Sequence, residues 1–364
     1  MATNPNWAFV TEVYPLDYLD SIWTGLEPSV LKRADNSIVV WELDGVSDSL
    51  GMQYANKEDF SSLIAMTKIA KAMDRGRPGW GFSYGNLPLD AGLVMGSCIA
   101  DQLSPFETKT PIMTNSVGSD FRTKWFEFVR DNEEALLKTD RIADVGVWFS
   151  PATKTFHDFA QGGVYGMYLD LDPPPGADSW WAVLPELSLR GTDHLAGWRG
   201  AAYALNEMHV PYKAVVDPGD PVGEMQGLSL MWLPSVTVLS DASAQMLRDF
   251  VSNGGTLFAT GLVPGSMDEH GVARAQSNLA DVFGFTSVGP GQGPRMQSFG
   301  QGSAIFRPDI KGVDLFETGG AAGAAALKEV NHGKVEQIVR IHTPDRIIAD
   351  EVGEGVYITV SEAS

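Results

Sequence analysis

Short apolar runs alternate with helical segments along this chain, and this alternation constrains the fold more than any other feature. WAFVTEVY (7–14), IVVWEL (38–43) and GWGFSYG (79–85) are rich in β-branched and aromatic residues. Before the third run, apolar residues recur at helical spacing from Phe60 to Met73. This order is typical of βαβ units, which assemble into parallel sheets. The sequence therefore predicts an α/β fold that begins with parallel strands.

A second α/β run begins near residue 142. Its predicted strands and helices follow one another as ADVGVWFSP, AGWRGAAYALNEMHVP, YKAVVDPG, LSLMWLPSVTVLS, DASAQMLRDFVSNGG and TLFATG. Asp241 is the candidate N-cap of the last helix, and Gly254 is its candidate C-cap. The pattern predicts a doubly wound domain over 142–364, after a first domain over 1–141. Its Gly-rich extension, 290–364, carries no function that the residues indicate.

The charge balance and the apolar pattern exclude several classes of protein. The chain has 364 residues, with 26 basic against 46 acidic side chains and a net charge of −20. Nucleic acid backbones and anionic membranes attract clustered positive charge, so we expect neither as a partner. No apolar run approaches the ~18–20 residues of a membrane span. MATNPNWAFV lacks the features of a secretory signal, and we expect the chain in the cytoplasm.

The residues that most often bind metals or form disulfides are sparse. Cys98 is the only cysteine, so it has no partner for an intramolecular disulfide. Six histidines are scattered without a His-x-x-x-His pair. In MDEHG (267–271) the neighbouring side chains point in different directions, which favours a polar turn over a metal site. We expect no metal and no cofactor.

Two glutamates are candidates for carboxylate chemistry. Glu42 is the next-to-last residue of the second apolar run, near the end of a strand, where parallel strands place functional side chains; a plain alternative is an ion pair with Lys57 or Arg77. Glu12 lies inside the alternation of the first run, which favours a solvent-facing side chain over a second catalytic carboxylate. The neighbouring aromatic residues are candidates for contact with a ring-shaped ligand, and they are Trp41, Trp80 and Tyr84.

The second run resembles a known domain. The matching pieces are ADVGVWFSP, GAAYALNEMHVPYKAVV, LSLMWLPSVTVLSDASAQMLRDFVSNGGTLFATGLVPGSMDEHG and NLADVFGF, with VGEGVYITV near the end. They resemble the glutamine-amidotransferase-like domain that follows the barrel in many glycoside hydrolases, known as the trimerisation domain in the family 42 β-galactosidases. True amidotransferases attack with a cysteine, and Cys98 lies outside these pieces. The resemblance therefore implies a domain for packing and oligomer formation.

The same resemblance makes the first domain the C-terminal portion of a (β/α)₈ barrel. Its three apolar runs become strands six, seven and eight, and Glu42 takes the place of the strand-seven nucleophile of retaining enzymes. Trp41, Trp80, Tyr84 and Glu12 then become candidate substrate contacts. A complete barrel takes about 250 residues, so residues 1–141 leave strands one to five and the strand-four acid to be supplied from elsewhere.

Two functions remain open from the sequence. The first is a retaining, β-galactosidase-like glycoside hydrolase, or a subunit or fragment of one, acting on a carbohydrate substrate. The alternative is a non-catalytic structural or carbohydrate-binding oligomerisation subunit. Under either, we expect a homo-oligomer, a trimer by the resemblance, or a second chain that completes the barrel.

Overall fold

The structure is a computed structural model, and it describes about three fifths of the chain. The described residues are 9–13, 37–42, 60–74, 79–82, 95–105, 116–136, 138, 142–161, 193–217, 221–288, 291–317 and 321–330. Two compact units are present, one made of Met1–Leu137, Phe149–Ala196 and Ala214–Glu224, the other of Lys138–Trp148, Gly197–Lys213 and Met225–Ser364. The predicted domain boundary at 141/142 stays a prediction.

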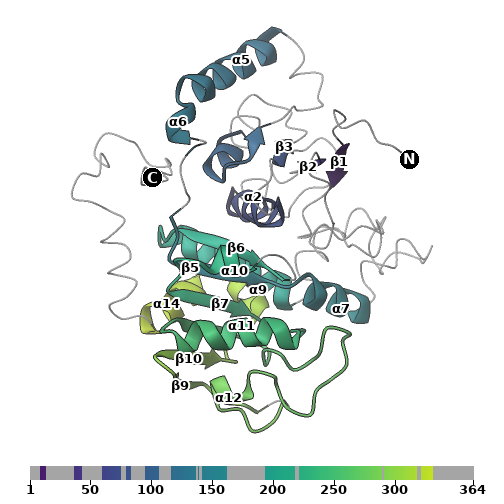
Figure 1. The fold of residues 1–364 in the computed structure, drawn as a ribbon, viewed down its shortest axis with the longest axis vertical. Helices are drawn as coiled ribbons and strands as arrows, with labels where there is room; N and C mark the ends of the chain where they lie inside the picture. Colours follow the sequence, from purple (N-terminus) through teal and green to yellow (C-terminus); the bar gives the residue numbers. More distant parts are fainter. Residues whose placement is uncertain are drawn as a thin grey trace. The chain divides into compact units, whose positions relative to one another are not determined.

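The first strands form a four-stranded parallel sheet (Figure 1). In sheet order its strands are β1 (Phe9–Val13), β2 (Ser37–Glu42), β3 (Gly79–Phe82) and β4 (Ser104–Pro105). Every neighbouring pair is parallel. The three predicted strands are confirmed, whereas β4 was not predicted, because a two-residue strand leaves no periodicity in the sequence.

Strand β2 is the buried centre of this sheet. Val39, Val40 and Trp41 are at most 3% exposed, so consecutive residues are covered on both faces, as expected of a parallel strand between helices. The predicted helix is α2 (Phe60–Asp74), and its apolar positions Met66 and Ile69 are fully buried. This burial fixes the strand that ends in Glu42.

The second sheet has six strands in the order β6-β5-β7-β8-β10-β9. Their bounds are Val145–Phe149 for β5, Tyr212–Val216 for β6, Leu230–Pro234 for β7, Thr256–Thr260 for β8, Arg295–Phe299 for β9 and Gly302–Arg307 for β10. The sheet is mostly parallel, and β9 at its edge is antiparallel to β10. The predicted α/β class is confirmed at this level.

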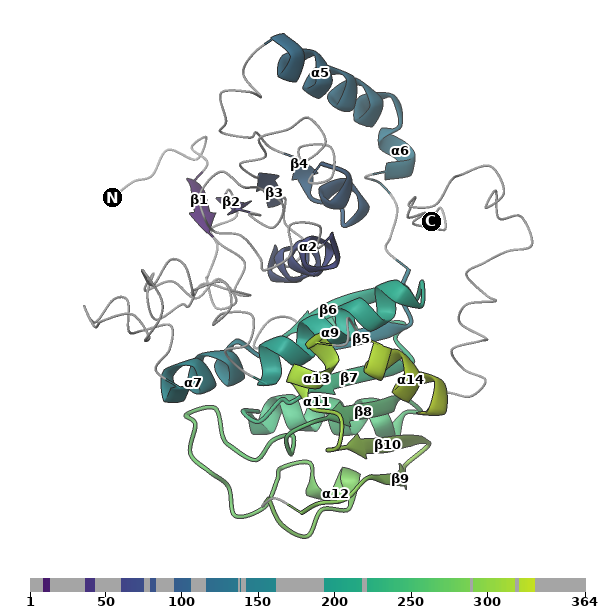
Figure 2. The ribbon, with the colours of Figure 1, turned by 180° about the vertical axis from the view of Figure 1, so that it is seen from behind.

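Helices cover both faces of the six-stranded sheet. Those of this part of the chain are α7 (Pro151–Gln161), α9 (Asp193–Glu207), α10 (Pro221–Met225), α11 (Asp241–Ser252), α12 (Ala280–Phe283), α13 (Gly312–Glu317) and α14 (Ala321–Val330). Helix α11 lies on one face, while α9, α13 and α14 gather on the other (Figures 1 and 2). A Cβ at Gly323 would lie 2.8 Å from the Trp232 ring, so α14 packs directly on β7.

The caps of α11 differ from the prediction by one residue at each end. Ser240 has extended backbone angles and its hydroxyl accepts the Ser243 N–H at 3.0 Å, so Ser240 is the N-cap and Asp241 is the first helical residue. Asn253 is the C-cap, and Gly254 follows it with φ of 107°. A serine directly before the predicted aspartate offers the same capping chemistry, which is why the pattern did not decide between them.

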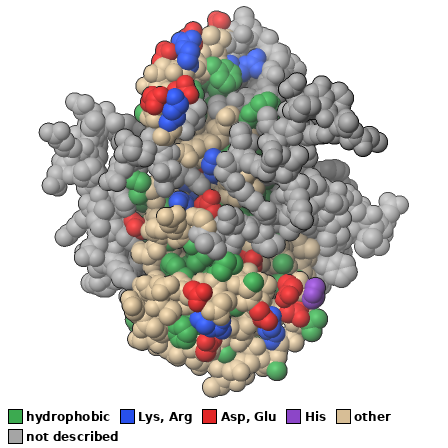
Figure 3. All heavy atoms as spheres, in the orientation of Figure 1, with side chains coloured by type: hydrophobic (Ala, Val, Ile, Leu, Met, Phe, Trp, Pro, Cys, Tyr) green, Lys and Arg blue, Asp and Glu red, His purple; other side chains and the backbone are tan. Residues whose placement is uncertain are grey.

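Two helices precede the six-stranded sheet in the sequence, α5 (Ser116–Asp131) and α6 (Glu133–Leu136). Phe126 and Phe128 in α5 are 46% and 49% exposed. Acidic and basic side chains gather on the same part of the chain, as the upper part of Figure 3 shows. Among the described residues, none of the helices combines the length and the apolar character that crossing a membrane requires.

Candidate functional site

The candidate site lies at the carboxyl edge of the four-stranded sheet. Glu42 is the last residue of β2 and stands opposite Phe82, the last residue of β3. Strands β1, β2 and β3 are parallel, so their carboxyl ends share this edge. The structure describes the backbone of Glu42 and Glu12 but not their side chains. It therefore places Glu42 where a strand-end carboxylate was predicted and leaves its role open.

Glu12 lies in β1, two residues further from the carboxyl edge of the sheet than Glu42. It pairs with Val40, and the next residue, Val13, ends β1 opposite Trp41. One strand spacing and two residues along the strand separate the Cα atoms of Glu12 and Glu42, a distance of about 8 Å. Glu12 is thus an interior strand residue, and its part in any site stays a prediction.

Trp41 is a core residue in this structure. Its side chain is 0% exposed, and its indole Nε1 donates a hydrogen bond to Asp74 Oδ1 at 2.9 Å. Asp74 is also fully buried, at the end of α2. A Cβ at Gly79 would collide with the Asp74 carboxylate, so glycine is required where β3 begins. Contact between Trp41 and a sugar stays a prediction, while its bond to Asp74 is a finding.

Of the other two predicted aromatic contacts, Trp80 lies among the described residues and Tyr84 does not. Trp80 lies in β3 opposite Val40 and is partly exposed. Tyr84 lies outside the described residues, as do Lys57 and Arg77, the alternative partners of Glu42. The structure therefore leaves both the ligand contact of Trp80 and the ion-pair alternative for Glu42 untested.

A second buried carboxylate fastens α2 to the segment before β4. Asp101 is 2% exposed, accepts the Thr67 hydroxyl at 2.6 Å and accepts Lys68 Nζ at 2.9 Å. Cys98 lies in the same segment and is fully buried. Burial raises the pKa of the Cys98 thiol, and the nearby charge of Asp101 raises it further. A buried thiol with a raised pKa is a poor nucleophile.

A buried serine that follows β5 meets a buried histidine from the start of α9. The backbone N–H of Ser150 donates to His194 Nε2 at 2.9 Å, and the imidazole ring lies 5.5 Å from the Phe149 ring. The Ser150 hydroxyl accepts the Thr153 N–H at 3.1 Å at the start of α7. The Ser150 hydroxyl thus accepts a hydrogen bond at the start of α7, and Nε2 of His194 accepts one from the backbone after β5.

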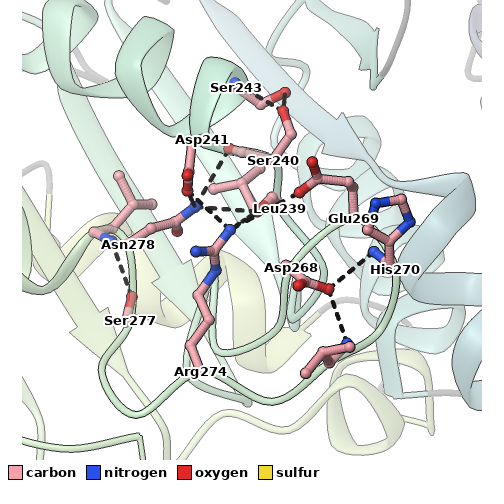
Figure 4. Close-up of polar contacts among 12 residues, drawn as sticks. Leu239, Ser240, Asp241, Ser243, Asp268, Glu269, His270, Arg274, Ser277 and Asn278 are labelled. Atoms are coloured by element: carbon pink, nitrogen blue, oxygen red, sulfur yellow. Dashed lines mark hydrogen bonds and ion pairs between the residues drawn. The ribbon is translucent and has the colours of Figure 1, made fainter.

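The MDEHG segment forms a polar turn, as predicted. Asp268 Oδ1 accepts the backbone N–H groups of His270 and Val272, each at 2.9 Å (Figure 4). These bonds, with Val272 the larger cause, hold the pKa of Asp268 below its ordinary value. Among the residues that the structure describes, no group of three or more His, Cys, Asp or Glu side chains is placed to bind a metal ion.

The loop after β8 is tied to the start of α11. Arg274 Nη2 lies 2.8 Å from Asp241 Oδ1, and Asn278 Nδ2 donates to the carbonyl oxygens of Leu239 at 3.0 Å and Ser240 at 3.3 Å (Figure 4). These contacts fix a long loop at the sheet's carboxyl edge. Sequence reasoning missed them because the partners lie more than 30 residues apart.

Two sheets with mostly parallel strands and helices on the faces define an α/β protein. The fold resembles a catalytic mutant of a family 42 β-galactosidase from G. stearothermophilus with a TM-score of 0.50, 12% sequence identity, and coverage of 81% of this chain and 49% of that chain. It also resembles the β-galactosidase from Bacillus circulans sp. alkalophilus, with a TM-score of 0.51, 10% identity, and coverage of 80% and 50%. No protein-family model and no curated protein matches the sequence.

The likeness concerns the fold. This chain spans about half the length of the β-galactosidases that it resembles. The resemblance inferred from the sequence is therefore confirmed as a structural similarity, over about four fifths of this chain. Activity, substrate and assembly are matters for proposal and experiment.

Proposed function

We propose that this chain is part of a retaining, β-galactosidase-like glycoside hydrolase in which Glu42 is the nucleophile. The observation that carries the proposal is the place of Glu42 at the end of β2, on the carboxyl edge of parallel strands, in a fold that resembles family 42 β-galactosidases. In (β/α)₈ barrels the catalytic residues stand at the carboxyl ends of strands. The four-stranded sheet is then the end of such a barrel, and the six-stranded sheet belongs to an amidotransferase-like trimerisation domain.

The reaction needs two carboxyl groups. The Glu42 carboxylate attacks the anomeric carbon while a second carboxylic acid protonates the departing oxygen, which gives a glycosyl-enzyme ester and a free alcohol. Water, deprotonated by the second group, then cleaves the ester and restores both residues. The two groups must stand about 5–5.5 Å apart. Glu12 lies two residues further from the carboxyl edge of the sheet than Glu42. We therefore propose that the second carboxyl group comes from barrel strands outside this chain.

The substrate is a carbohydrate, and we propose Trp80 and Tyr84 as its aromatic contacts. Trp80 is partly exposed one strand away from β2, whereas Trp41 is held in the core. Aromatic rings suit the apolar faces of sugars because they bury C–H groups without competing for the hydroxyl hydrogen bonds.

The six-stranded sheet serves assembly in this proposal. The chain's only thiol, Cys98, is buried outside this sheet, so the sheet lacks the cysteine with which amidotransferases attack. We propose a homo-oligomer, a trimer by analogy, or a complex with a second chain that completes the barrel, acting in the cytoplasm. A non-catalytic structural or carbohydrate-binding oligomerisation subunit is the alternative, favoured by a chain that spans about half the length of the β-galactosidases that it resembles.

The test uses the protein purified together with any chains that accompany it. Hydrolysis of 4-nitrophenyl β-galactoside and related glycosides is compared between the wild type, Glu42→Gln and Glu42→Gly, with Glu207→Gln, at an exposed glutamate, as the matched control. We expect kcat to fall at least about 1,000-fold in both Glu42 variants, because the carbon–oxygen bond cannot form without the nucleophile. Azide should restore turnover of Glu42→Gly by forming a glycosyl azide. Undiminished activity in Glu42→Gln would reject the assignment, and an inactive wild type would favour the oligomerisation subunit.

A further inference from the structure

Asp74 joins three consecutive elements of one βαβ unit. It is the last residue of α2, its carboxylate accepts the Trp41 indole N–H of β2 at 2.9 Å, and it packs against Gly79 at the start of β3. The side chains of Trp41 and Asp74 are fully buried. A hydrogen bond to a carboxylate is stronger than one between neutral groups, so this contact restrains the end of β2 against α2.

The restraint acts one residue from Glu42. Pairing between β1 and β2 extends to Val13 opposite Trp41, whereas pairing with β3 continues to Phe82 opposite Glu42. The position of the last β2 residue therefore depends on β3 from the side and on Trp41 along the chain. Loss of the Asp74 contact frees the Trp41 ring and with it the end of the strand.

We infer that Asp74 is a positioning residue, which acts through the Trp41 indole to hold the backbone of Glu42 in place for attack on the glycoside. This inference rests on the function proposed for Glu42. Displacement of a reacting group by about 1 Å lowers a rate by about 100-fold while substrate binding changes little. An acceptor at position 74 is thus needed for turnover beyond its contribution to folding.

Asp101 offers a matched control because it is another buried carboxylate that accepts hydrogen bonds from side chains of α2. It accepts hydrogen bonds from Thr67 and Lys68 in the middle of α2 and does not contact Trp41 through them. Removal of Asp101 should weaken the packing of α2 to a similar degree without releasing the end of β2. Comparison of the Asp74 and Asp101 variants therefore separates an effect on the position of Glu42 from a general loss of stability.

The experiment measures kcat and KM of the assembled enzyme for Asp74→Ala, Asp74→Asn, Trp41→Phe and Asp101→Ala, at a temperature where all are folded. Amide hydrogen exchange of the β2 peptide is followed in parallel. We expect Asp74→Ala to lower kcat by 10- to 100-fold with KM within about threefold of the wild type. Asp74→Asn keeps an acceptor oxygen and should recover most of kcat. Trp41→Phe should match Asp74→Ala, and combining the two should cost little more.

The outcomes separate this inference from the proposed function. If Glu42→Gln is inactive while Asp74→Ala keeps the wild-type kcat, or if Asp101→Ala loses kcat equally, the inference is wrong and the proposed function stands. If Glu42→Gln is fully active, the proposed nucleophile is wrong. Hydrogen exchange then judges the restraint alone, since faster exchange at Trp41 and Glu42 in Asp74→Ala supports it and unchanged exchange overturns it.

Discussion

The guanidinium of Arg248 binds both carboxylate oxygens of Asp281, with Nε 2.8 Å from Oδ2 and Nη2 3.0 Å from Oδ1. A further bond from Arg248 Nη2 reaches the Asn278 carbonyl oxygen at 2.7 Å. The pair thereby joins α11 to α12, two elements that are otherwise connected through β8 and a long loop. A bidentate arginine–carboxylate pair is the ion-pair geometry most able to contribute to stability at a surface.

Replacement of Asp281 by Asn should lower the free energy of unfolding by about 0.5–1 kcal/mol at pH 7, since the Asp281 side chain is 51% exposed and solvent screens the pair. The Arg248 hydrogen bond is the main cause that lowers the pKa of Asp281. The contribution is therefore present above the ordinary aspartate pKa of about 3.9 and is lost as the pH falls through the lowered pKa. Urea unfolding at pH 7 and pH 3 measures it.

Asp131→Asn is the matched control for this prediction. Its carboxylate pairs with the adjacent Arg130 at 2.8 Å, but both side chains are more than 60% exposed. We expect no measurable change in unfolding at either pH. A difference between Asp281→Asn and the wild type that persists unchanged at pH 3 would contradict the assigned role of the charge.

Gly79→Ala should lower the free energy of unfolding by about 1–3 kcal/mol, because the added methyl group meets the buried Asp74 carboxylate. Gly293→Ala is the control, since its methyl group would enter open space. We expect that change to be neutral or to stabilise by up to about 1 kcal/mol through the unfolded chain. Thermal and urea unfolding compare the two, and equal effects would be at odds with the packing at Gly79.

His209→Gly should raise the free energy of unfolding by up to about 1 kcal/mol. His209 has φ of 54° at the end of α9, where its N–H bonds to the Asn206 carbonyl and the Val210 N–H bonds to the Leu205 carbonyl. This is the left-handed position at which glycine is favoured. Glu207→Gly, at the last helical residue of α9, should instead destabilise the fold. A destabilised His209→Gly would show that the imidazole does more than occupy the turn.

The Cys98 thiol should resist a disulfide reagent such as DTNB in the folded chain at pH 8. Burial keeps it neutral and covered, so modification requires opening of the fold. The released thionitrobenzoate is followed with and without urea, and we expect the native rate to be at least 100-fold slower. Because the chain has one cysteine, rapid labelling without urea would identify Cys98 as accessible.

The sequence predicted the elements whose burial shows in their composition. IVVWEL became β2, and the helical spacing between Phe60 and Met73 became α2, because both are buried and their apolar patterns record it. Helix α7 and strand β10 were not predicted. Helix α7 follows directly after β5, and β10 pairs with β8 from more than 40 residues away, which no local pattern reveals.

The candidate site was predictable only in part for a similar reason. Glu42 was found because strand ends can be read from one run of residues. Asp74 was missed because its partner Trp41 lies 33 residues away and an aspartate at a helix end resembles any solvated acid. The clue in hindsight is the pair of glycines around Trp80, since Gly79 is needed to admit the Asp74 carboxylate.

Covalent trapping tests most directly whether Glu42 is the nucleophile. The assembled protein is incubated with an activated 2-deoxy-2-fluorogalactoside, whose fluorine slows cleavage of the glycosyl-enzyme ester, and is then digested and analysed by mass spectrometry. We expect one added fluorosugar per active site, attached to Glu42 in the peptide that contains β2. The Glu42→Gln variant should carry none. An active enzyme that carries the sugar on another residue, or on another chain, would contradict it.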